Sequence, residues 1–397
     1  MKTNRVYKMR ELCEITSSKR IYAADYKPDG VPFYRGKEIS EKFKGNLDVS
    51  TELFIDRDKF EQIRHRFGAP IGGDLLLTSV GTLGSPYVVN NGEEFYFKDG
   101  NLTWFRKFNH LESQFLYYWL QSSQGKAELK KCTIGSSQSA YTIVLLKEME
   151  ITLPPLPVQR KIAAILSAYD DLIENNRRRM ALLEEAARLM YQEWFVHLRF
   201  PGHEHTRITE GVPKGWERKA IGELADITMG QSPESKFYND VGEGIPFHQG
   251  VTDFGDRFVT NRIYSTAFNR IANAGEILCS VRAPVGKLNI TLEKIVIGRG
   301  LAALRSRTKH QSLLFYQLRN YFFKEDIIGT GAIFASVTKR EFSNQKLLVP
   351  PKRLAGTFEE LTVNIDDEIR LLHLQNQKLR AARDLLLPRL MSGEIAV

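Results

Sequence analysis

The chain has 397 residues, which is long for a single core, so two or three domains are expected. Hydrophobic residues make up 42% of it and charged residues 26%, a balance that excludes a disordered or fibrous protein. Lysine and arginine outnumber aspartate and glutamate by 56 to 47, and the net charge of +9 favours a polyanionic partner.

The sequence also bears on compartment and cysteine chemistry. No window approaches the roughly 18 consecutive apolar residues of a membrane span, and the charged N-terminus lacks a signal peptide's apolar core. We therefore expect a cytoplasmic protein. Cys13, Cys132 and Cys279 are odd in number and far apart. They are expected to be buried free thiols, not a disulfide framework or a zinc site.

Residues 1–153 form the first predicted unit, a mixture of strands, loops and one helix. Glycine-punctuated β-rich runs predict strands within 74–80 and 94–97, and residues 113–120 predict the helix. The pair Pro154-Pro155 then opens a long helix over 154–197, since proline is tolerated in a first helical turn.

This long helix carries an apolar seam that advances in alternating steps of four and three residues. Nine of ten seam positions are apolar or aromatic, which is typical of a coiled coil. The alternative is an ordinary core helix of one large domain. The seam comprises Ile162, Leu166, Tyr169, Ile173, Asn176, Met180, Leu183, Ala187, Met190 and Trp194.

After a linker over 198–215, the chain repeats itself. Pro154-Pro155 is matched by Pro350-Pro351, an offset of 196 residues. The same offset pairs Gly135 with Gly331, Asp170-Asp171 with Asp366-Asp367, Ile173 with Ile369, Ala186 with Ala382 and Leu189 with Leu385. Such an ordered series indicates a tandem duplication.

The second copy consists of a unit over 216–349 and a second long helix with a C-terminal tail over 350–397. Strands are predicted within 276–281 and 294–297, and a helix over 311–322. The second seam is weaker but of the same kind. It comprises Phe358, Thr362, Ile365, Ile369, Leu372, Asn376, Leu379, Arg383, Leu386 and Leu390.

These elements predict an α+β fold: two repeated mixed α/β domains separated by a pair of long antiparallel coiled-coil helices. One amphipathic helix cannot bury its stripe alone, and a second helix of similar length is present. Asn176 and Asn376 interrupt the two seams, and a buried polar residue at such a position commonly fixes the register.

No catalytic, cofactor-binding or metal site stands out. The stretch 298–303 fits G-x-G-x-x-A but lacks the acidic residue that should follow about twenty positions later. A nuclease motif from Pro28-Asp29 and Glu38 has Ser40 where lysine is expected, and His203-Glu204-His205 does not have the spacing of a helical zinc pair.

Glycine-rich loops of both units instead carry polar and basic side chains suited to DNA. Arginine, glutamine, serine and threonine read base edges, while lysine and arginine hold phosphates. The plainer interpretation is solvated turns shaped by glycine. The candidate DNA contacts are Lys19, Arg20, Tyr34, Arg35, Lys37, Ser79, Thr82, Ser137, Gln138, Gln231, Ser232, His248, Gln249, Arg282, Arg299 and Thr330.

Several segments together resemble one family, the specificity subunits of type I restriction–modification enzymes. The second helix departs from the family pattern, because Lys352-Arg353-Leu354-Ala355 replaces the expected Glu-Gln sequence. The resemblance covers essentially the whole chain. It rests on residues 153–162, 194–196, 200–204, 211–217, 230–233 and 386–395.

The resemblance implies a non-catalytic subunit with two target-recognition domains, each reading one half of a split DNA site, with the helix pair setting the gap. It also implies two methyltransferase (modification) subunits and motor–nuclease (restriction) subunits as partners. S-adenosylmethionine, ATP and Mg²⁺ would bind those partners, and no cofactor would bind this chain. Two other hypotheses remain open: a stand-alone DNA-binding regulator of the same fold, and a nuclease with a concealed active site.

Overall fold

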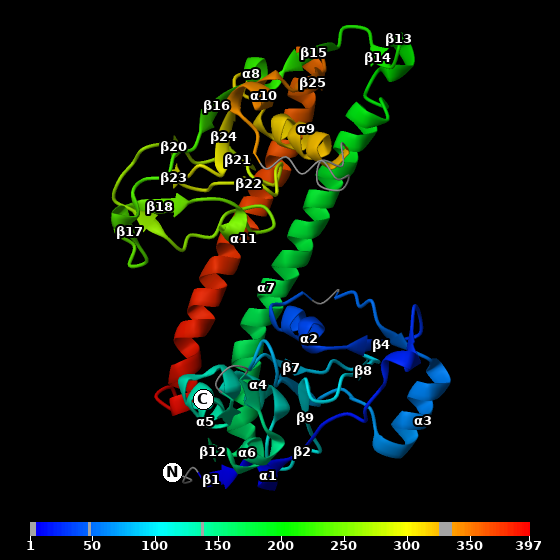
Figure 1. Cartoon of the computed structure of the whole chain (residues 1–397), viewed down its shortest axis with the longest axis vertical. Helices are drawn as coiled ribbons and strands as arrows, with labels where there is room; N and C mark the ends of the chain where they lie inside the picture. The colour runs from blue at the N-terminus through cyan, green and yellow to red at the C-terminus, as the bar shows by residue number, and fades with distance from the viewer. Residues whose placement is uncertain (1–4, 47–48, 136–138, 325–335) are drawn as a thin grey trace. The chain divides into compact units, whose positions relative to one another are not determined.

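The computed structural model describes residues 5–46, 49–135, 139–324 and 336–397. The chain divides into two compact units, one of Met1–Arg178 with His373–Val397 and one of Arg179–Leu372. Each unit holds one strand-rich head and a stretch of both long helices (Figure 1). We refer to residues 5–153 as head 1 and to residues 216–349 as head 2.

Head 1 contains two four-stranded sheets among its described residues. The first is antiparallel and has the order β2 (Glu14–Thr16), β9 (Leu102–Arg106), β6 (Leu75–Thr78), β7 (Pro86–Val88). The second has the order β3 (Tyr26–Lys27), β5 (Phe54–Ile55), β4 (Val31–Tyr34), β8 (Tyr96–Phe97), and its strands β4 and β8 are parallel.

Shorter pairings and several helices complete head 1. Strand β1 (Arg5–Lys8) pairs with β12 (Glu150–Leu153) and joins the two ends of the head. Strand β10 (Thr133–Ile134) pairs with β11 (Ala140–Tyr141). The sequence predicted one helix in head 1, and the structure has six among the described residues, because locally capped short segments also become helical. The helices are α1 (Met9–Leu12), α2 (Gly36–Phe43), α3 (Arg57–Phe67), α4 (Ser113–Gln121), α5 (Ser123–Lys131) and α6 (Ile143–Glu148).

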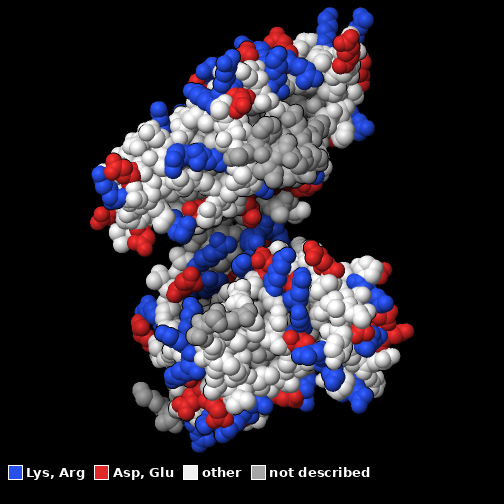
Figure 2. Space-filling model, viewed as in Figure 1, with Lys and Arg blue, Asp and Glu red and all other residues white. Residues whose placement is uncertain are grey.

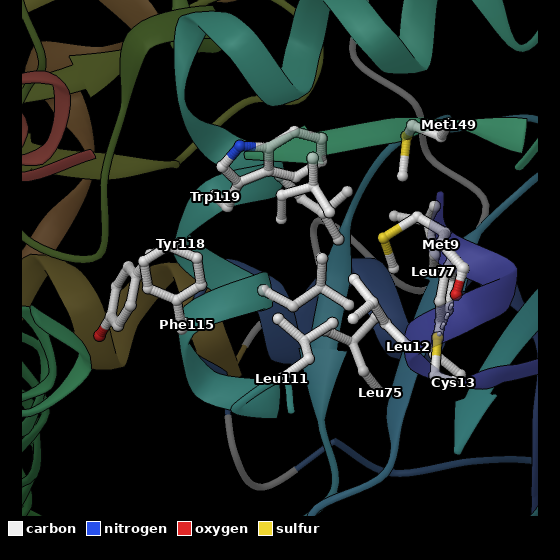
Figure 3. Close-up of a cluster of buried hydrophobic side chains, with 14 of the residues drawn as sticks. Met9, Leu12, Cys13, Leu75, Leu77, Leu111, Phe115, Tyr118, Trp119 and Met149 are labelled. Atoms are coloured by element: carbon white, nitrogen blue, oxygen red, sulfur yellow. Dashed lines mark hydrogen bonds between the residues drawn. The ribbon is translucent and has the colours of Figure 1, made fainter. Parts of the chain in front are cut away.

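The core of head 1 brings distant segments of the chain together. Figure 3 shows Met9 and Leu12 of α1, Leu75 and Leu77 of β6, and Phe115 of α4 pointing toward one another. Both long helices enter the same cluster, through Ile162 and Leu166 on one and Leu390 on the other. Cys13, Cys132 and Cys279 are all buried free thiols, as predicted.

Head 2 repeats this topology. Its first sheet has the order β16 (Ala225–Met229), β24 (Leu301–Ser306), β21 (Ile277–Ser280), β22 (Leu288–Ile290). Its second has the order β17 (Tyr238–Asn239), β19 (Tyr264–Ser265), β18 (Ile245–His248), β23 (Ile295–Ile297), β20 (Ile271–Ala272), with β18 parallel to β23. The β1–β12 pairing recurs as β15 (Glu217–Ala220) with β25 (Lys346–Val349).

The helices of head 2 and the linker are short apart from one. They are α8 (Ile221–Leu224), α9 (Gln311–Lys324) and α10 (Lys339–Asn344). In the linker, β13 (Ile208–Thr209) pairs with β14 (Val212–Pro213), and residues 203–205 form one turn of 3-10 helix. None of the helices among the described residues is long and apolar enough to cross a membrane.

Each proline pair opens a long helix, as predicted. Helix α7 spans Leu156–Tyr191 and continues as a π-helical turn over Gln192–Val196, and α11 spans Lys352–Ser392. None of the twenty predicted seam residues is exposed. Within the first unit Asp170 of α7 pairs with Arg383 of α11, and Asn176 is hydrogen-bonded to Asn376. Within the second, Arg179 pairs with Glu368 at 2.6 Å, and the ring centroids of Tyr191 and Phe358 lie 6.1 Å apart. In each unit the residue number of the partner falls as α7 advances, so the two helices are antiparallel there, as predicted.

The two seam asparagines meet in the first unit. Asn176 Nδ2 donates to Asn376 Oδ1 at 3.0 Å, and Asn376 Nδ2 donates to the Ile173 carbonyl at 3.1 Å. Both side chains are buried. A shift of one helical turn would separate the two amides and leave both without these bonds, so the pair specifies one register.

Head 2 is attached to both long helices through a buried cation. The guanidinium of Arg257, 6% exposed, pairs with Glu184 of α7 and with Asp366 of α11, the latter at 2.5 Å. It also lies 4.5 Å from the ring centroid of Phe315. A buried charge needs full pairing, and both helices must be in place to supply it.

We predict that Asn376→Leu lowers the stability of the chain by about 1–3 kcal/mol, because Asn176 loses its partner inside the seam. The double substitution Asn176→Leu with Asn376→Leu recovers most of the loss, since neither amide then remains buried. Urea unfolding followed by circular dichroism measures both effects, and Gln377→Ala on the exposed face of α11 is the matched control. A double variant no more stable than Asn376→Leu would contradict the pairing argument.

Candidate nucleic-acid interface

Three loops of head 2 meet at one edge of its sheets. They follow β16, follow β18, and connect β23 to β24. Because β18 and β23 are parallel, their carboxyl ends reach the same edge. Backbone bonds join the loops: Gln231 N donates to Ile297 O at 2.9 Å, and Gly298 N donates to His248 O at 2.8 Å.

Glycine permits this close approach. A Cβ atom on Gly230 would lie 2.1 Å from the Gly298 carbonyl oxygen, and one on Gly300 would lie 2.5 Å from the Gln249 carbonyl oxygen. Any larger residue at either position would push the loops apart. The glycines that resembled a nucleotide-binding motif therefore serve loop packing, and they lead into strand β24 where that motif requires a helix.

Four predicted DNA contacts are brought together here. Ser232 Oγ donates to Gln249 Oε1 at 2.9 Å and accepts from Arg299 N at 3.2 Å. Gln231, Gln249 and Arg299 are exposed, and Ser232 is half-buried. No described residue forms an ion pair with Arg299, so its guanidinium is free to bind an anion or a base.

Head 1 builds the same edge from the loops after β2, after β4 and between β8 and β9. Lys98 N donates to Tyr34 O at 2.9 Å, which is the counterpart of the bond from Gly298 to His248. Ser18 Oγ donates to Phe97 O at 2.7 Å, and Lys19 N donates to the Tyr96 hydroxyl at 2.7 Å. Both heads thus place three separated loops at equivalent positions.

The basic side chains of this edge in head 1 differ in their pairing. Lys19 and Lys37 are exposed. Arg20 pairs with Asp99 at 2.8 Å, and this hydrogen bond raises the pKa of Arg20. Arg35 pairs with Glu38 at 2.8 Å. Burial by itself would raise the pKa of Glu38, but the hydrogen bonds from Arg35 lower it overall.

Three of the candidates are buried and cannot touch DNA in this conformation. Tyr34 stacks on Phe95 with ring centroids 4.6 Å apart, and burial raises its pKa to about 12. Ser79 is hydrogen-bonded to Thr103 at 2.7 Å. His248 is fully buried, with Nε2 3.0 Å from Asn261 Oδ1. These side chains support the loops from beneath, because aromatic and strand-end residues are drawn into the core.

Two further candidates lie on the hairpin turns between β6 and β7 and between β21 and β22. Thr82 and Arg282 are exposed there. Isolated bridges join Val80 to Ala140 and Arg282 to Ser336. Ser137, Gln138 and Thr330 lie outside the described residues.

Lys98 is a residue that the sequence did not single out. It is half-buried beside Asp99, in the loop of head 1 that corresponds to the loop of Gly298 and Arg299. Aligning the strand-like runs 94–97 and 294–297 of the two copies would have indicated Lys98, which follows the first run as Gly298 follows the second. On the face shown in Figure 2, basic side chains of each unit lie among acidic ones and form no single continuous basic field.

The other sequence motifs build no catalytic site. Glu38 is buried against Arg35. Across the described ranges no group of three or more His, Cys, Asp or Glu residues is arranged to hold a metal ion.

The chain was compared with known proteins once this geometry was established. The family model for the type I restriction modification DNA specificity domain matches residues 1–185 and 213–355. This chain belongs to that family. The two matches correspond to the two copies of the repeat, so the predicted family membership and the predicted α+β fold with two repeated domains are both confirmed.

Named relatives agree with the assignment. The putative type I restriction enzyme MjaX specificity subunit of Methanocaldococcus jannaschii is 30% identical, covering 93% of this chain and 88% of that protein. The MjaIX specificity subunit of the same organism is 27% identical, with 82% and 78% covered. The crystal structure of the S subunit of a type I restriction–modification system from M. genitalium has a TM-score of 0.61 at 16% identity, a likeness of fold over 98% of this chain and 96% of that one.

The chain is thus a type I specificity subunit with DNA-recognition domains. Specificity subunits catalyse no reaction themselves, which confirms the prediction of a non-catalytic component. A nuclease with a concealed active site is no longer a candidate.

We predict that the stability of the second unit falls as the pH drops from about 7 to 5. Burial lowers the pKa of His248 below 6.5, although the bond to Asn261 and the charges of Asp253 and Glu293 oppose the shift. The unfolded chain therefore binds the proton more readily, so acid favours unfolding. His248→Gln should flatten this dependence in urea titrations, whereas His205→Gln, at an exposed position, should leave it unchanged. Equal slopes for wild type and His248→Gln would refute the assignment.

Proposed function

We propose that the two heads read the two halves of a split DNA target through their equivalent three-loop edges. The observation that carries the proposal is the convergence of Gln231, Ser232, Gln249 and Arg299 from three separate loops of head 2. Head 1 presents Lys19, Arg20 and Arg35 from the corresponding loops and Lys37 from the first turn of α2. Because the side chains differ, the two half-sites differ in sequence.

The chemistry of each edge favours a division between base reading and phosphate binding. The amides of Gln231 and Gln249 can form bidentate hydrogen bonds to adenine, and Arg299 can do so with guanine. Lys19 and Lys37 carry charges that phosphates can neutralise, which strengthens binding to any sequence. Arg20 and Arg35 already pair with carboxylates and add less net charge.

The long helices set the gap between the half-sites and carry the partner subunits. Several leucines and one valine on them remain exposed, an arrangement that favours burial against another protein. Leu189 and Leu385, related by the 196-residue offset, are 47% and 71% exposed. Two modification subunits would bind such equivalent surfaces. The other exposed residues are Leu172, Leu182, Leu361, Val363 and Leu371.

The proposed complex places all chemistry outside this chain. The modification subunits bind S-adenosylmethionine and methylate adenine after flipping it out of the duplex. The motor–nuclease subunits use ATP and Mg²⁺ for translocation and cleavage. The specificity subunit supplies the geometry that brings these activities to one DNA sequence.

Co-expression tests the whole proposal. The full chain is produced with the modification subunit of its own system in a host that lacks adenine methylation, and methylated adenines are mapped by single-molecule sequencing. We expect a split motif with a fixed gap that disappears when this chain is omitted. No motif from a folded, DNA-binding chain would instead favour a stand-alone DNA-binding regulator.

We predict that Gln231→Ala with Gln249→Ala relaxes the base preference at the second half-site, with about 1–3 kcal/mol of discrimination lost for each bidentate contact removed. The first half-site stays unchanged, because it is read by the other head. Methylation mapping measures this, and Arg218→Ala on β15 is the control for an exposed residue away from the loops. An unchanged second half-site in a folded double variant would exclude these loops as readers.

A further inference from the structure

Helix α3 (Arg57–Phe67) belongs to head 1 alone. It occupies the connection between β5 and β6 (Figure 1). Strands β5 and β19 correspond, because each pairs with the strand of its head that also has a parallel partner. The connection that follows β19, whose residues are all described, contains the short strand β20 and no helix. A contact between α3 and a ligand would therefore distinguish the two heads.

A buried tyrosine fixes α3 beside the loop that follows β2. The Asp56 carboxylate caps the helix by accepting from two backbone N–H groups of its first turn. Phe60 and Ile63, one turn apart, lie in the same core cluster as Tyr96 of β8. The Tyr96 hydroxyl accepts from Lys19 N at 2.7 Å. The helix and the loop that carries Lys19 thus share one support, and neither can shift without disturbing that core.

The last turn of α3 is attached to the first sheet of head 1. The Phe67 carbonyl accepts from Arg106 Nη1 at 3.3 Å, and Arg106 lies on β9. Gly68 then ends the helix with a positive φ of 87°, and a Cβ atom there would lie 2.9 Å from Arg106 Nη1. Arg106 also pairs with Glu14 of β2, the strand that leads to Lys19. The end of α3 is thus attached to the sheet from which this loop projects.

Two cations from separate segments share one aromatic ring at this point. Lys19 Nζ lies 5.2 Å from the ring centroid of Phe67, and the guanidinium carbon of Arg66 lies 5.2 Å from the same centroid. The ring is 40% exposed, and Lys19 and Arg66 are exposed as well. Neither cation has an ion-pair partner among the described residues. Two like charges repel each other in the free protein, so an anion that reaches both is bound more strongly than by either alone.

The alternative is that these charges only stabilise the fold. A helix C-terminus favours cations, which would account for Arg66, but Lys19 belongs to another segment and has no such role. Asp99, an acidic residue of the three-loop edge, already pairs with Arg20 at 2.8 Å and does not neutralise the two cations. The charge gathered on Phe67 therefore stays available to a partner.

We propose that Lys19 and Arg66, gathered on Phe67, bind backbone phosphates of DNA beside the first half-site. The inference rests on the proposed function, since Lys19 belongs to the three-loop edge, and it adds α3 to that surface. Phosphates are favoured over base edges, because two unpaired charges close together match a strand that carries a charge on every nucleotide. Such contacts strengthen binding to any sequence and leave the base preference unchanged. Head 2 lacks α3, so they flank only one half-site.

The salt dependence of DNA binding tests these contacts. The full chain, assembled with the modification subunit of its own system, is titrated with a duplex that carries its split motif and with an unrelated duplex, between about 50 and 200 mM salt. Arg66→Gln and Lys19→Gln should each reduce the slope of log affinity against log salt by about 0.9, the value for one phosphate contact. The affinity gained on lowering the salt then shrinks by a factor of about 3.5. The methylated motif should not change.

Two further variants of α3 are the matched controls. Arg57→Gln makes the same change in net charge at the other end of the helix, about 13 Å away along its axis, and should leave the slope unchanged. Phe67→Leu removes the ring but keeps both charges, so it should lower the affinity less than Arg66→Gln does and leave the slope unchanged. An equal fall in slope for Arg57→Gln would show a general charge effect and overturn the assignment.

Neutral methylphosphonate groups placed one at a time in the duplex locate the contact. One beside the first half-site should weaken binding by the wild type and have no effect on Arg66→Gln. No position beside the second half-site should distinguish the two proteins. Positions that weaken both proteins equally throughout the duplex would overturn the contact between Arg66 and a phosphate.

Comparison of the lysine and arginine variants separates α3 from the three-loop edge. A wild-type slope for Arg66→Gln with a lowered slope for Lys19→Gln would overturn the role of α3 and leave the three-loop edge intact. Wild-type slopes for both variants would overturn the phosphate contacts proposed for head 1 altogether. Loss of assembly with the modification subunit in Arg66→Gln, with the DNA slope unchanged, would assign the cations to that protein and overturn the phosphate site.

Discussion

The structure depends on the fact that one amphipathic helix cannot bury its apolar stripe alone. Each unit solves this with an antiparallel pair formed by parts of α7 and α11, and each pair is completed by its own head. In the first unit, Ile162, Leu166 and Leu390 belong to the same core as the strands of head 1. In the second, Ala187, Tyr191 and Phe358 belong to the core of head 2. Neither head is therefore independent of the helices.

The two copies share a topology but use different interactions to join head and helices. One contact is shared: the Tyr118 hydroxyl donates to Asp170 at 2.6 Å in the first unit, and Tyr316 is hydrogen-bonded to Asp366 in the second. Other contacts differ. The first unit uses the neutral amide of Gln159, whereas in the second Glu359 caps α9 and Glu184 and Asp366 surround Arg257. Duplication fixes the fold, because the seam and sheets persist, and it leaves the polar contacts free to diverge.

The loops that we propose to contact DNA likewise combine a shared framework with divergent side chains. Their positions follow from strands that have the same order in both heads, apart from the additional strand β20 of head 2, and in particular from the parallel pairs β4–β8 and β18–β23. Their side chains are not constrained by that framework, since they project from its edge. A recognition protein of this kind can change the sequence it reads while its core and its helix pair stay the same.

The sequence alone determined the features that depend on periodicity and repetition. The heptad steps identified both seams, Pro154-Pro155 and Pro350-Pro351 marked the starts of both helices, and the offset of 196 residues revealed the duplication. These signals are local, and they are repeated along the chain. The same periodicity identified Asn176 and Asn376 as interruptions of the two seams, whereas their mutual hydrogen bond is known only from the structure.

Only the tertiary structure decided which loop residues can meet a ligand. Gln231, Gln249 and Arg299 converge through contacts between strands far apart in the chain, whereas Tyr34, Ser79 and His248 are drawn into the core. The same loop composition is compatible with either outcome, because burial depends on long-range packing.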